Sequence, residues 1–402
     1  RAVRGGTFHQ FAAAQLRRYS HEAEIDRGFT ILDRDASQDA IRAARRQRGV
    51  KAGDAPAPAK LQRFFSAVAN REARLEQVVG DAFRHQLGAI ADIRQGYEDL
   101  KARSGHLDFD DLLVRFERLL RDDSHVREEI SAQCEYVLVD EYQDTNLIQA
   151  RIAQHLSDVH GNLMAVGDDA QSIYSFRGAR VENMLTFHES FKGSKTLALQ
   201  QNYRSTQQIL DFSNRVLEGA PGCVKKRLTS PRRGAMPKPV LVTGGSALEQ
   251  AEFVLREVEE HRGAGKPLSE MAVLFRSAFH SNYLEVLLSK HGVPFRKFGG
   301  LRFLKRAQDV ISLLHIAAKP KDELAWGRIA QKLPGIGEKT AARIAEQVLA
   351  HPDGELDLKR WGGNKKYGTG LRDLDGVLRE LRASVVIGAV ERAVETAIDW
   401  CK

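Results

Sequence analysis

Two adjacent carboxylates, Asp140 and Glu141, directly follow the apolar segment 136–139. This segment suits a buried strand, and ligands of α/β sheets bind at the carboxyl ends of such strands. One carboxylate there can hold Mg²⁺ through its water shell, while the other orients or deprotonates an attacking water. With Gln143 and Asp144 beside them, the two acids predict the carboxylate half of a nucleotide-hydrolysis site. The phosphate-binding sequence G-x-x-x-x-G-K-[ST] occurs nowhere in the 402 residues.

A second polar loop, residues 167–179, follows the next candidate strand. A glutamine at such a strand end can bond a terminal phosphate or its attacking water, which is the role expected for Gln171. Tyr174 and Phe176 alternate along the loop and can present two ring faces to unpaired bases, each stack contributing roughly 1–3 kcal/mol. Arg177 can contact the phosphate between two such bases. The alternative is that both rings belong to the core.

A third strand end carries an arginine. Arg204 lies between the apolar segment 196–199 and a helix whose N-cap is Ser205 or Thr206. An arginine at such an edge can act as an arginine finger on a γ-phosphate, a contribution of roughly 10³–10⁵ in rate. The alternative for this residue is an ordinary salt bridge.

Strand and helix patterns alternate around these loops, which predicts an α/β fold, a parallel sheet with helices packed on it. The predicted strands are 136–139, 163–166, 196–199, 240–242 and 271–275. Four helices are predicted in this region. One has Ile148, Ile152 and Leu156 on one face, and the next has Ile209, Phe212 and Val216 on one face. The other two span 248–262 and 281–290.

The flanking regions are mainly helical in pattern. Residues 1–19 predict a short strand or turn and then a helix from near Gln10, and residues 107–113 open a helix with acids in its first turn. The other predictions are helices over 20–106 with a basic loop at 42–60, helical segments after 303 interrupted at 333–337, a loop at 351–372 and a final helix over 374–400.

The composition favours a soluble protein with a polyanionic partner. The net charge is +8 and the pI about 9.3, and nucleic acid is the commonest partner of such a surplus. Residues 224–238 contain six basic side chains and no acidic one, which predicts either a phosphate-contacting surface or a solvated loop. These are Lys225, Lys226, Arg227, Arg232, Arg233 and Lys238.

Compartment and redox state follow from what the sequence does not contain. No apolar run is long enough to span a bilayer and no secretory signal pattern is present, so we expect a cytoplasmic protein with no membrane partner. The three cysteines, at 134, 223 and 401, are far apart and show no C-x-x-C pairing. Neither a zinc site nor a disulfide framework is therefore predicted.

In their order and spacing, the three polar loops resemble motifs II, III and IV of the superfamily 1 DNA helicases of the UvrD/Rep/PcrA type. The resemblance covers nearly the whole chain and is weakest over 351–402. Residues 6–11 resemble the Thr-Phe-His strand of that family, which contacts single-stranded DNA. Segments 29–33 and 107–113 resemble the family's flanking 1B and 1A segments. Segments 273–276 and 297–303 resemble the second motor domain, and 333–340 resembles the start of the 2B subdomain.

The resemblance implies two RecA-like parallel-sheet motor domains, both incomplete, with helical insertions. Residues 1–19 and 107–218 would belong to the first motor domain (1A), and 20–106 to a helical insertion (1B). Residues 219–332 would be part of the second motor domain (2A), and 333–402 the start of the helical 2B subdomain.

The resemblance also implies roles for individual residues toward ATP, Mg²⁺ and DNA. Asp140 would coordinate Mg²⁺, Glu141 would activate the hydrolytic water, and Gln171 and Arg204 would sense and stabilise the γ-phosphate. DNA-binding residues would be Tyr174 and Phe176 on the bases, and Thr7, His9 and Arg177 on the strand backbone. The family usually has Trp where Phe176 stands, so weaker stacking is expected here.

The implied activity is ATP-dependent 3′-to-5′ translocation on single-stranded DNA with duplex unwinding, in DNA repair or replication. Because the Walker A loop and the later motifs are missing, we expect a helicase fragment that by itself hydrolyses little or no ATP. Its expected partners are single-stranded and duplex DNA, with repair or replication proteins as further candidates.

Three alternatives stay open. One is a non-catalytic DNA-binding or assembly module with a helicase fold, and another is the helicase subunit of a helicase–nuclease complex. The coding DNA upstream of Arg1 would discriminate the first of these from a clipped motor. The third concerns residues 333–340, whose Pro-Gly-Ile-Gly sequence fits either a helix–hairpin–helix that holds a DNA phosphate or a tight turn between two helices.

Overall fold

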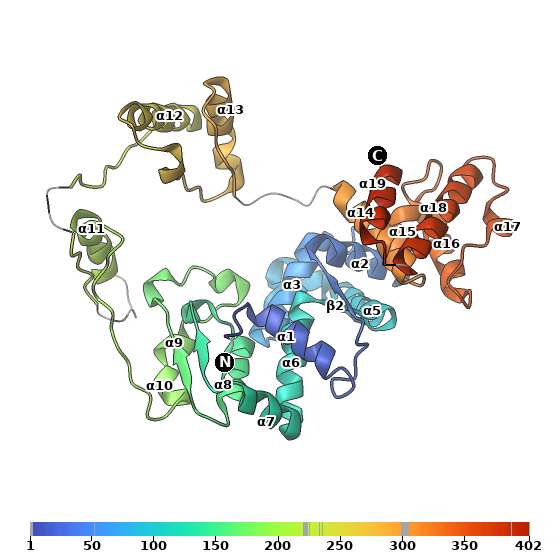
Figure 1. Cartoon of the computed structure of the whole chain (residues 1–402), viewed down its shortest axis with the longest axis horizontal. Helices are drawn as coiled ribbons and strands as arrows, with labels where there is room; N and C mark the ends of the chain where they lie inside the picture. The colour runs from blue at the N-terminus through green and yellow to red at the C-terminus, as the bar shows by residue number, and fades with distance from the viewer. Residues whose placement is uncertain are drawn as a thin grey trace. The chain divides into compact units, whose positions relative to one another are not determined.

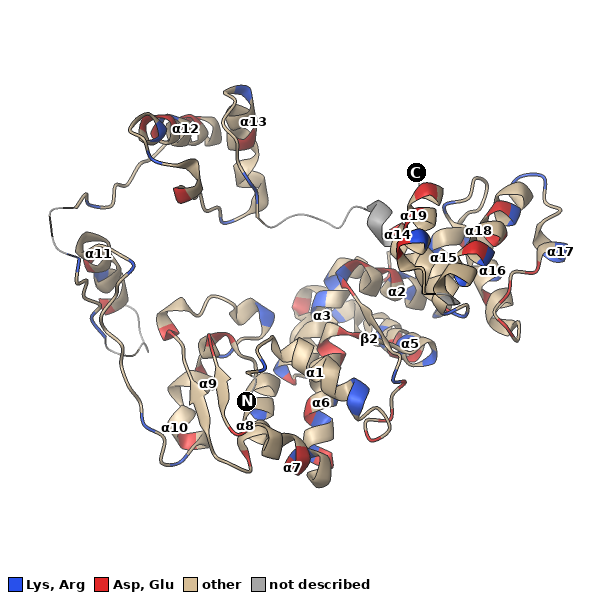
Figure 2. Ribbon diagram, in the orientation of Figure 1, with Lys and Arg blue, Asp and Glu red and all other residues tan. Residues whose placement is uncertain are grey.

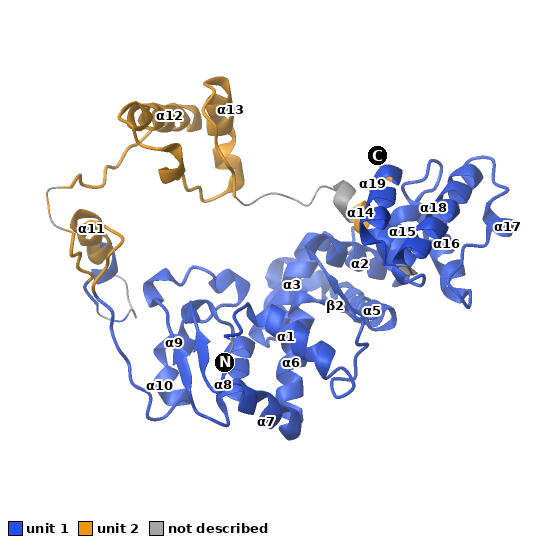
Figure 3. Cartoon of the chain, in the orientation of Figure 1, with its two compact units in different colours: residues 1–200, 216–227, 312–400 blue, residues 201–215, 228–311, 401–402 orange. Residues whose placement is uncertain are grey.

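The computed structural model describes residues 3–51, 53–219, 224, 226–232, 234, 236–298, 305–386 and 388–401. Cys223, Lys225, Arg233 and residues 299–303, which appear in the sequence predictions, lie outside the described residues. The chain divides into two compact units (Figure 3). Unit 1 comprises Arg1–Gln200, Val216–Arg227 and Ser312–Trp400, and unit 2 comprises Gln201–Arg215, Leu228–Ile311 and Cys401–Lys402.

The described residues of unit 1 form mainly helices, together with four short strands (Figure 1). Its first part contains α1 (Phe8–Arg18), β1 (Thr30–Leu32), α2 (Arg34–Gln47), α3 (Pro58–Arg71), α4 (Leu75–Val79), α5 (Leu87–Ser104), β2 (His106–Asp108), α6 (Phe109–Asp122) and α7 (Ser124–Gln133). There follow β3 (Val137–Val139), α8 (Leu147–Ser157), β4 (Leu163–Ala165), α9 (Glu182–Leu185) and α10 (Phe187–Ser190). Its last part contains α15 (Glu323–Ala330), α16 (Glu338–Ala350), α17 (Leu358–Trp361), α18 (Gly368–Val386) and α19 (Val390–Trp400).

Unit 2 is smaller, and two helices form its apolar core. Its full helices are α12 (Ala247–Gly263) and α13 (Asn282–Lys290), while α11 (Gln207–Glu218) and α14 (Lys305–Ala318) each run across a unit boundary. Leu255 of α12 and Leu284 and Leu288 of α13 are buried together. The predicted helices at 248–262 and 281–290 are therefore confirmed.

Two separate apolar cores hold the N-terminal part of unit 1 together. One lies among α1, α6, α7 and α8 and includes the fully buried Leu16 and Phe116. The other lies among α2, α3 and α5 and includes the fully buried Ile41 and Ile93. Burying each side chain of this size contributes roughly 1.5–3 kcal/mol to folding.

Helix α6 confirms the prediction of a helix with acids in its first turn. The Asp108 carboxylate accepts the backbone N–H of Asp111 at 2.9 Å, and the Asp111 carboxylate accepts that of Asp108 at 2.9 Å. This reciprocal cap satisfies two backbone donors that the helix leaves free. Lys101 of α5 donates to both carboxylates, at 2.9 and 2.7 Å, so α5, β2 and the start of α6 share one buried polar cluster.

The strands form two parallel pairs, β1 with β2 and β3 with β4. In the second pair Val137 faces Leu163 and Val139 faces Ala165. The predicted strands 136–139 and 163–166 are thus confirmed, with their expected parallel direction. Burial is only partial, because Leu138 is 72% exposed whereas Val139 is buried against α8.

Three other predicted strands, 196–199, 240–242 and 271–275, are wrong. These segments have no regular secondary structure in the part of the chain that is described, and Leu197, Leu241 and Leu274 are 85%, 90% and 94% exposed. A strand needs a neighbour to satisfy its backbone polar groups, and none of the three has a paired one among the described residues. An apolar sequence pattern alone does not show whether a neighbouring strand is present to pair with the segment.

The predicted strand-like segment 6–11 is also wrong, because α1 begins at Phe8. Thr7 is the N-cap: its hydroxyl accepts the backbone N–H of Gln10 at 3.2 Å, and the Gln10 side chain accepts that of Thr7 at 3.1 Å. This capping box starts the helix two residues earlier than near Gln10, the start that the sequence predicted.

Other element limits also differ from the predictions. The loop expected at 42–60 is shorter, since α2 continues to Gln47 and α3 begins at Pro58. Residues 351–372 contain α17 and the start of α18, and the final helix is split into α18 and α19 at Gly388, which has a φ of 72°. A positive φ is easily adopted only by glycine.

Two predicted helix faces have different outcomes. Ile148, Ile152 and Leu156 are buried in α8, as expected. In α11, by contrast, Ile209, Phe212 and Val216 are exposed, and Leu210 and Asn214 are the buried residues. No described helix combines the length and apolarity that crossing a membrane requires.

Candidate nucleotide and nucleic-acid site

The chain turns sharply where β3 ends at the two carboxylates. Glu141 has a left-handed backbone, with φ 51° and ψ 43°, and its N–H donates to the Asp140 carboxylate at 2.9 Å. A left-handed non-glycine residue costs about 1–3 kcal/mol and is commonest at functional sites. Both carboxylates are exposed, and the N–H of Tyr142 donates to Val166 at 2.9 Å, so the turn continues the β3–β4 ladder.

The loop after β4 places Gln171 beside an acidic pair. The Gln171 amide donates to the carboxylate of Asp168 at 2.8 Å, and Lys226 pairs with Asp168 and with Asp169. Burial alone would raise the pKa of both carboxyls, but the hydrogen bonds and charge of Lys226 outweigh it, so the pKa of each is lowered. The acidic pair is therefore ionised at neutral pH and holds the amide.

The structure brings Asp140, Glu141 and Gln171 to one end of the parallel pair. Gln143 connects the two loops, because it contacts both Glu141 and the backbone of Asp168. This arrangement agrees with the prediction that the ends of neighbouring parallel strands share one edge. An acid that can position water and an amide that can contact a phosphate are thus held in one hydrogen-bonded assembly.

Asp140 fits a Mg²⁺ ligand of the kind that nucleotide sites use. Its carboxylate is exposed, with one oxygen accepting the N–H of Glu141. Mg²⁺ bound with a nucleotide usually takes only one or two protein carboxylates, since phosphate oxygens and waters complete its octahedron. The described residues contain no group of three or more His, Cys, Asp or Glu side chains that could hold a metal ion.

Two exposed rings lie farther along the same loop. Tyr174 is 36% and Phe176 66% exposed, and their centroids are 6.0 Å apart at an angle of 49°. The guanidinium of Arg177 lies 4.8 Å from the first ring and 5.5 Å from the second. The alternative that both rings belong to the core is therefore wrong, and both are available for stacking.

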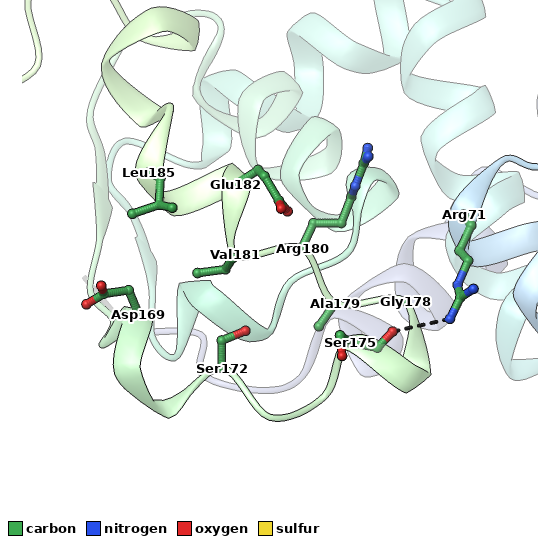
Figure 4. Close-up of a pocket in the computed structure, with 10 residues that line it drawn as sticks. All are labelled: Arg71, Asp169, Ser172, Ser175, Gly178, Ala179, Arg180, Val181, Glu182 and Leu185. Atoms are coloured by element: carbon green, nitrogen blue, oxygen red, sulfur yellow. Dashed lines mark hydrogen bonds between the residues drawn. The ribbon is translucent and has the colours of Figure 1, made fainter. Parts of the chain in front are cut away.

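A pocket of about 400 Å³ is lined by residues of the loop after β4, by α9 and by Arg71 of α3 (Figure 4). Asp169 and Arg71 mark its opposite ends, and Arg71 donates to the carbonyl oxygen of Ser175 at 3.4 Å. Its other lining residues include Ser172, Gly178, Arg180 and Glu182. Polar side chains of the loop after β4 and Arg71 of α3 therefore line the same pocket.

The two predicted DNA contacts near the N-terminus have different surroundings. Thr7 is exposed but uses its hydroxyl to cap α1. His9 is partly buried and packs edge-on to Phe109, with centroids 5.7 Å apart. Burial lowers the pKa of His9, so its imidazole is neutral at neutral pH.

Arg204 lies in unit 2, in an exposed turn before α11. The Asn202 side chain holds this turn by accepting the N–H of Arg204 at 3.0 Å and of Ser205 at 2.8 Å. The turn also rests on the segment 228–232, where Arg232 donates to the carbonyl of Tyr203 at 3.1 Å. The guanidinium of Arg204 is in no ion pair within the described residues, so the structure gives no support to the salt-bridge alternative.

Reasoning from sequence missed three side chains of this site: Lys226, Arg71 and the bridging role of Gln143. Lys226 was expected in a phosphate-contacting or solvated basic segment, but its side chain is 14% exposed and pairs with acids. No local pattern signals this pairing, because 57 and 58 residues separate the partners. The sequence alone places Gln143 only next to the two acids. Its position two residues after Glu141 is the signal that could have indicated a contact between the two side chains.

Comparison with known families agrees with this geometry. Residues 1–192 match the UvrD/REP helicase N-terminal domain, and residues 197–351 match the UvrD-like helicase C-terminal domain. The chain belongs to the UvrD/Rep helicase family. Helices α17, α18 and α19 lie beyond the part that matches these two domains.

Individual UvrD-type helicases are similar over most of the chain. The ATP-dependent DNA helicase PcrA of Staphylococcus epidermidis is 32% identical over 352 residues, which are 85% of this chain and 47% of that protein. DNA helicase II of Escherichia coli is 33% identical over 340 residues, 83% of this chain and 46% of that protein. The chain thus spans about half the length of these UvrD-type relatives.

Proposed function

We propose that this UvrD-type chain is part of an ATP-dependent DNA helicase that moves 3′-to-5′ on single-stranded DNA and unwinds duplex DNA in repair or replication. The observation that carries the proposal is one loop, 167–179. It supplies both Gln171, which is linked to Glu141 through Asp168 and Gln143, and the exposed rings of Tyr174 and Phe176. One loop would therefore carry both the side chain that contacts the ATP phosphate and the rings that stack on DNA bases, so the two binding sites are only a few residues apart.

Within this function each residue has a defined chemical task. Asp140 would hold Mg²⁺, and the ion would supply positive charge to the phosphates of ATP. The Glu141 carboxylate orients the attacking water and accepts its proton, while Gln171 donates to the γ-phosphate or to that water. Arg204 would stabilise the negative charge that develops on the γ-phosphate.

The DNA contacts follow from the exposed rings. Tyr174 and Phe176 stack on successive bases, and Arg177 contacts the phosphate between them. Thr7 and His9 contact the strand backbone from the start of α1. Phe176 presents a smaller face than the Trp usual in this family, so its stack on a base is expected to be weaker than that of a Trp.

The turn before α16 is a candidate contact for duplex DNA. Leu333 and Ile336 are buried, which fixes the turn, and Gly335 has a φ of 83°. Lys366 lies against Gly335, and blue segments of Figure 2 mark Lys and Arg of the nearby α17. We assign this surface to a DNA phosphate, with a purely structural turn as the alternative.

The domain assignment is also part of the proposal. Residues 1–19 and 107–218 would form part of one RecA-like domain and 219–332 part of another, with 20–106 and 333–402 as the helical 1B and 2B regions. The parallel β3–β4 pair with α8 packed on it supports the first of these.

This polypeptide alone is expected to hydrolyse little ATP, because its 402 residues contain no G-x-x-x-x-G-K-[ST] loop. The lysine and backbone N–H groups of that loop supply much of the phosphate contact. DNA-stimulated turnover by this chain that disappears in Glu141→Gln would contradict the expectation.

The experiment that tests the proposed function is binding to single-stranded and to duplex DNA over a salt series. If Tyr174 and Phe176 stack on bases, the chain should bind single-stranded DNA more tightly than duplex DNA. This preference should persist as salt rises, since stacking is less salt-dependent than phosphate contact. Equal, steeply salt-dependent binding to both would favour a DNA-binding module without a helicase track.

A further inference from the structure

We propose that Gln143 is a positioning residue that couples the Glu141 carboxylate to the Gln171 amide through one chain of hydrogen bonds. This inference rests on the proposed function for the roles of Glu141 and Gln171. Gln143 would contact neither the nucleotide nor DNA, and would act by holding the Glu141 carboxylate and the loop of Gln171 in place.

The Gln143 side chain joins two loops by two different bonds. Its Nε2 donates to Oε2 of Glu141 at 2.7 Å, and its Oε1 accepts the backbone N–H of Asp168 at 3.0 Å. A backbone N–H can only donate, so the Asp168 bond fixes the amide oxygen on that side and turns the amino group toward Glu141. With the residue only 1% exposed, water is not available to replace either partner.

The chain of bonds continues from Asp168 to Gln171. Oδ2 of Asp168 accepts the Gln171 amide at 2.8 Å, while Oδ1 accepts the N–H of Ala170 at 3.1 Å and pairs with Lys226. Asp168 therefore donates its backbone N–H to Gln143 and accepts the Gln171 amide with its carboxylate. A displacement of either loop changes the geometry at the other.

The space around Gln143 leaves it little freedom. A Cβ added at Gly167 would lie 2.5 Å from Oε1 of Gln143 and 3.2 Å from the backbone N of Tyr142. Real Cβ atoms do not approach so closely, so only glycine lets the amide reach Asp168. Ser172 further donates from its hydroxyl to the backbone carbonyl of Gln143 at 3.4 Å.

This geometry has a consequence for Glu141. Its left-handed backbone sets the direction of the side chain, and the Gln143 bond holds one carboxylate oxygen, Oε2. The other oxygen is left to orient a water. The Gln171 amide has a second N–H for a phosphate oxygen, so movement of Gln171 on phosphate contact is transmitted through Asp168 and Gln143 to the carboxylate.

The test follows the side-chain amide of Gln171 by NMR in the full chain labelled with ¹⁵N-glutamine. Glu141→Gln, which removes the charge at one end, is expected to shift the Gln171 amide signal. In a Gln143→Leu background the same substitution is expected to produce no shift. Gln149→Leu is the matched control, because Gln149 accepts the Asn146 N–H at 3.0 Å in the cap of α8 and should leave the shift intact.

A second measurement separates coupling from stability. Gln143→Glu keeps an acceptor for the Asp168 N–H but loses the donor to Glu141. The Asp168 amide should therefore exchange with solvent roughly tenfold faster in Gln143→Leu than in Gln143→Glu. The Gln171 response to Glu141→Gln should be lost in Gln143→Leu, which has neither a donor nor an acceptor at this position.

A Gln171 shift that persists in Gln143→Leu would overturn the proposal. Equal Asp168 exchange in the two variants would overturn it as well, since the Asp168 bond would then not depend on this amide. Neither measurement uses ATP or DNA, so failure of the coupling and failure of the helicase assignment give distinguishable results.

Discussion

The ammonium group of Lys226 pairs with the carboxylate of Asp169, whose side chain is only 2% exposed. The same ammonium group pairs with Asp168, the residue that holds Gln171. A lysine from a segment expected to face DNA or solvent instead pairs with both acids of the loop that follows β4.

Lys226→Met is expected to lower the free energy of unfolding by about 3 kcal/mol, because it leaves buried negative charge without a partner. Urea unfolding at neutral pH measures this change. Lys195→Met, at an exposed lysine, is the control and should change stability by less than about 0.5 kcal/mol. An equal effect of the two substitutions would contradict the assigned pairing.

The same pair has a pH signature. Since the fold lowers the pKa of both Asp168 and Asp169, their stabilisation is present above about pH 4 and is lost as pH falls through the lowered values. Lys226→Met should therefore reduce the loss of stability on acidification. A steeper acid limb in the variant would be the opposite of this result.

Asp111 predicts a pH dependence of the opposite sign. Burial and the charge of Asp108 raise the pKa of Asp111 to about 6, although Lys101 lowers it. The folded state then binds this proton more tightly than the unfolded state, so stability from this group falls as pH rises from about 4 to 6.

Asp111→Asn should remove that slope while keeping an acceptor oxygen for the cap of α6. Urea unfolding at pH values across this window measures the slope. Asp92→Asn on the exposed face of α5 is the control and should leave it unchanged. An unaltered slope in Asp111→Asn would assign the titration to another group.

Gly167→Ala tests the close contact between Gly167 and the Gln143 amide. The added methyl group must displace Oε1 of Gln143, for which overpacking predicts a loss of about 1–3 kcal/mol in the free energy of unfolding. Gly88→Ala in α5, where an added Cβ meets nothing within 4 Å, should be neutral or stabilising. Equal stability of the two variants, measured by chemical denaturation, would show that Gln143 can move without loss.

Local sequence predicted the part of the site that depends on strand ends. Asp140 and Gln171 each follow a short apolar strand, and parallel strands present their carboxyl ends at one edge, so their proximity could be inferred. Capping patterns at α6 were likewise readable, because both partners lie within one helical turn.

The remainder depends on contacts between residues far apart in sequence. Lys226 meets Asp168 across 58 residues, and the exposed segment 240–242 has apolar residues without a paired strand. Tyr174 and Phe176 could equally have been core or surface, since composition does not state which neighbours cover a ring. The limits of the proposed RecA-like domains depend on similar long-range contacts.

The measurement that tests the central claim most directly is the affinity for single-stranded DNA of Tyr174→Ala/Phe176→Ala against the unsubstituted chain, at several salt concentrations. If both rings stack on bases, the double variant loses roughly 2–6 kcal/mol of binding free energy while its salt dependence stays unchanged. Equal affinity of the two proteins at every salt concentration would contradict the claim that this loop is a base-stacking track.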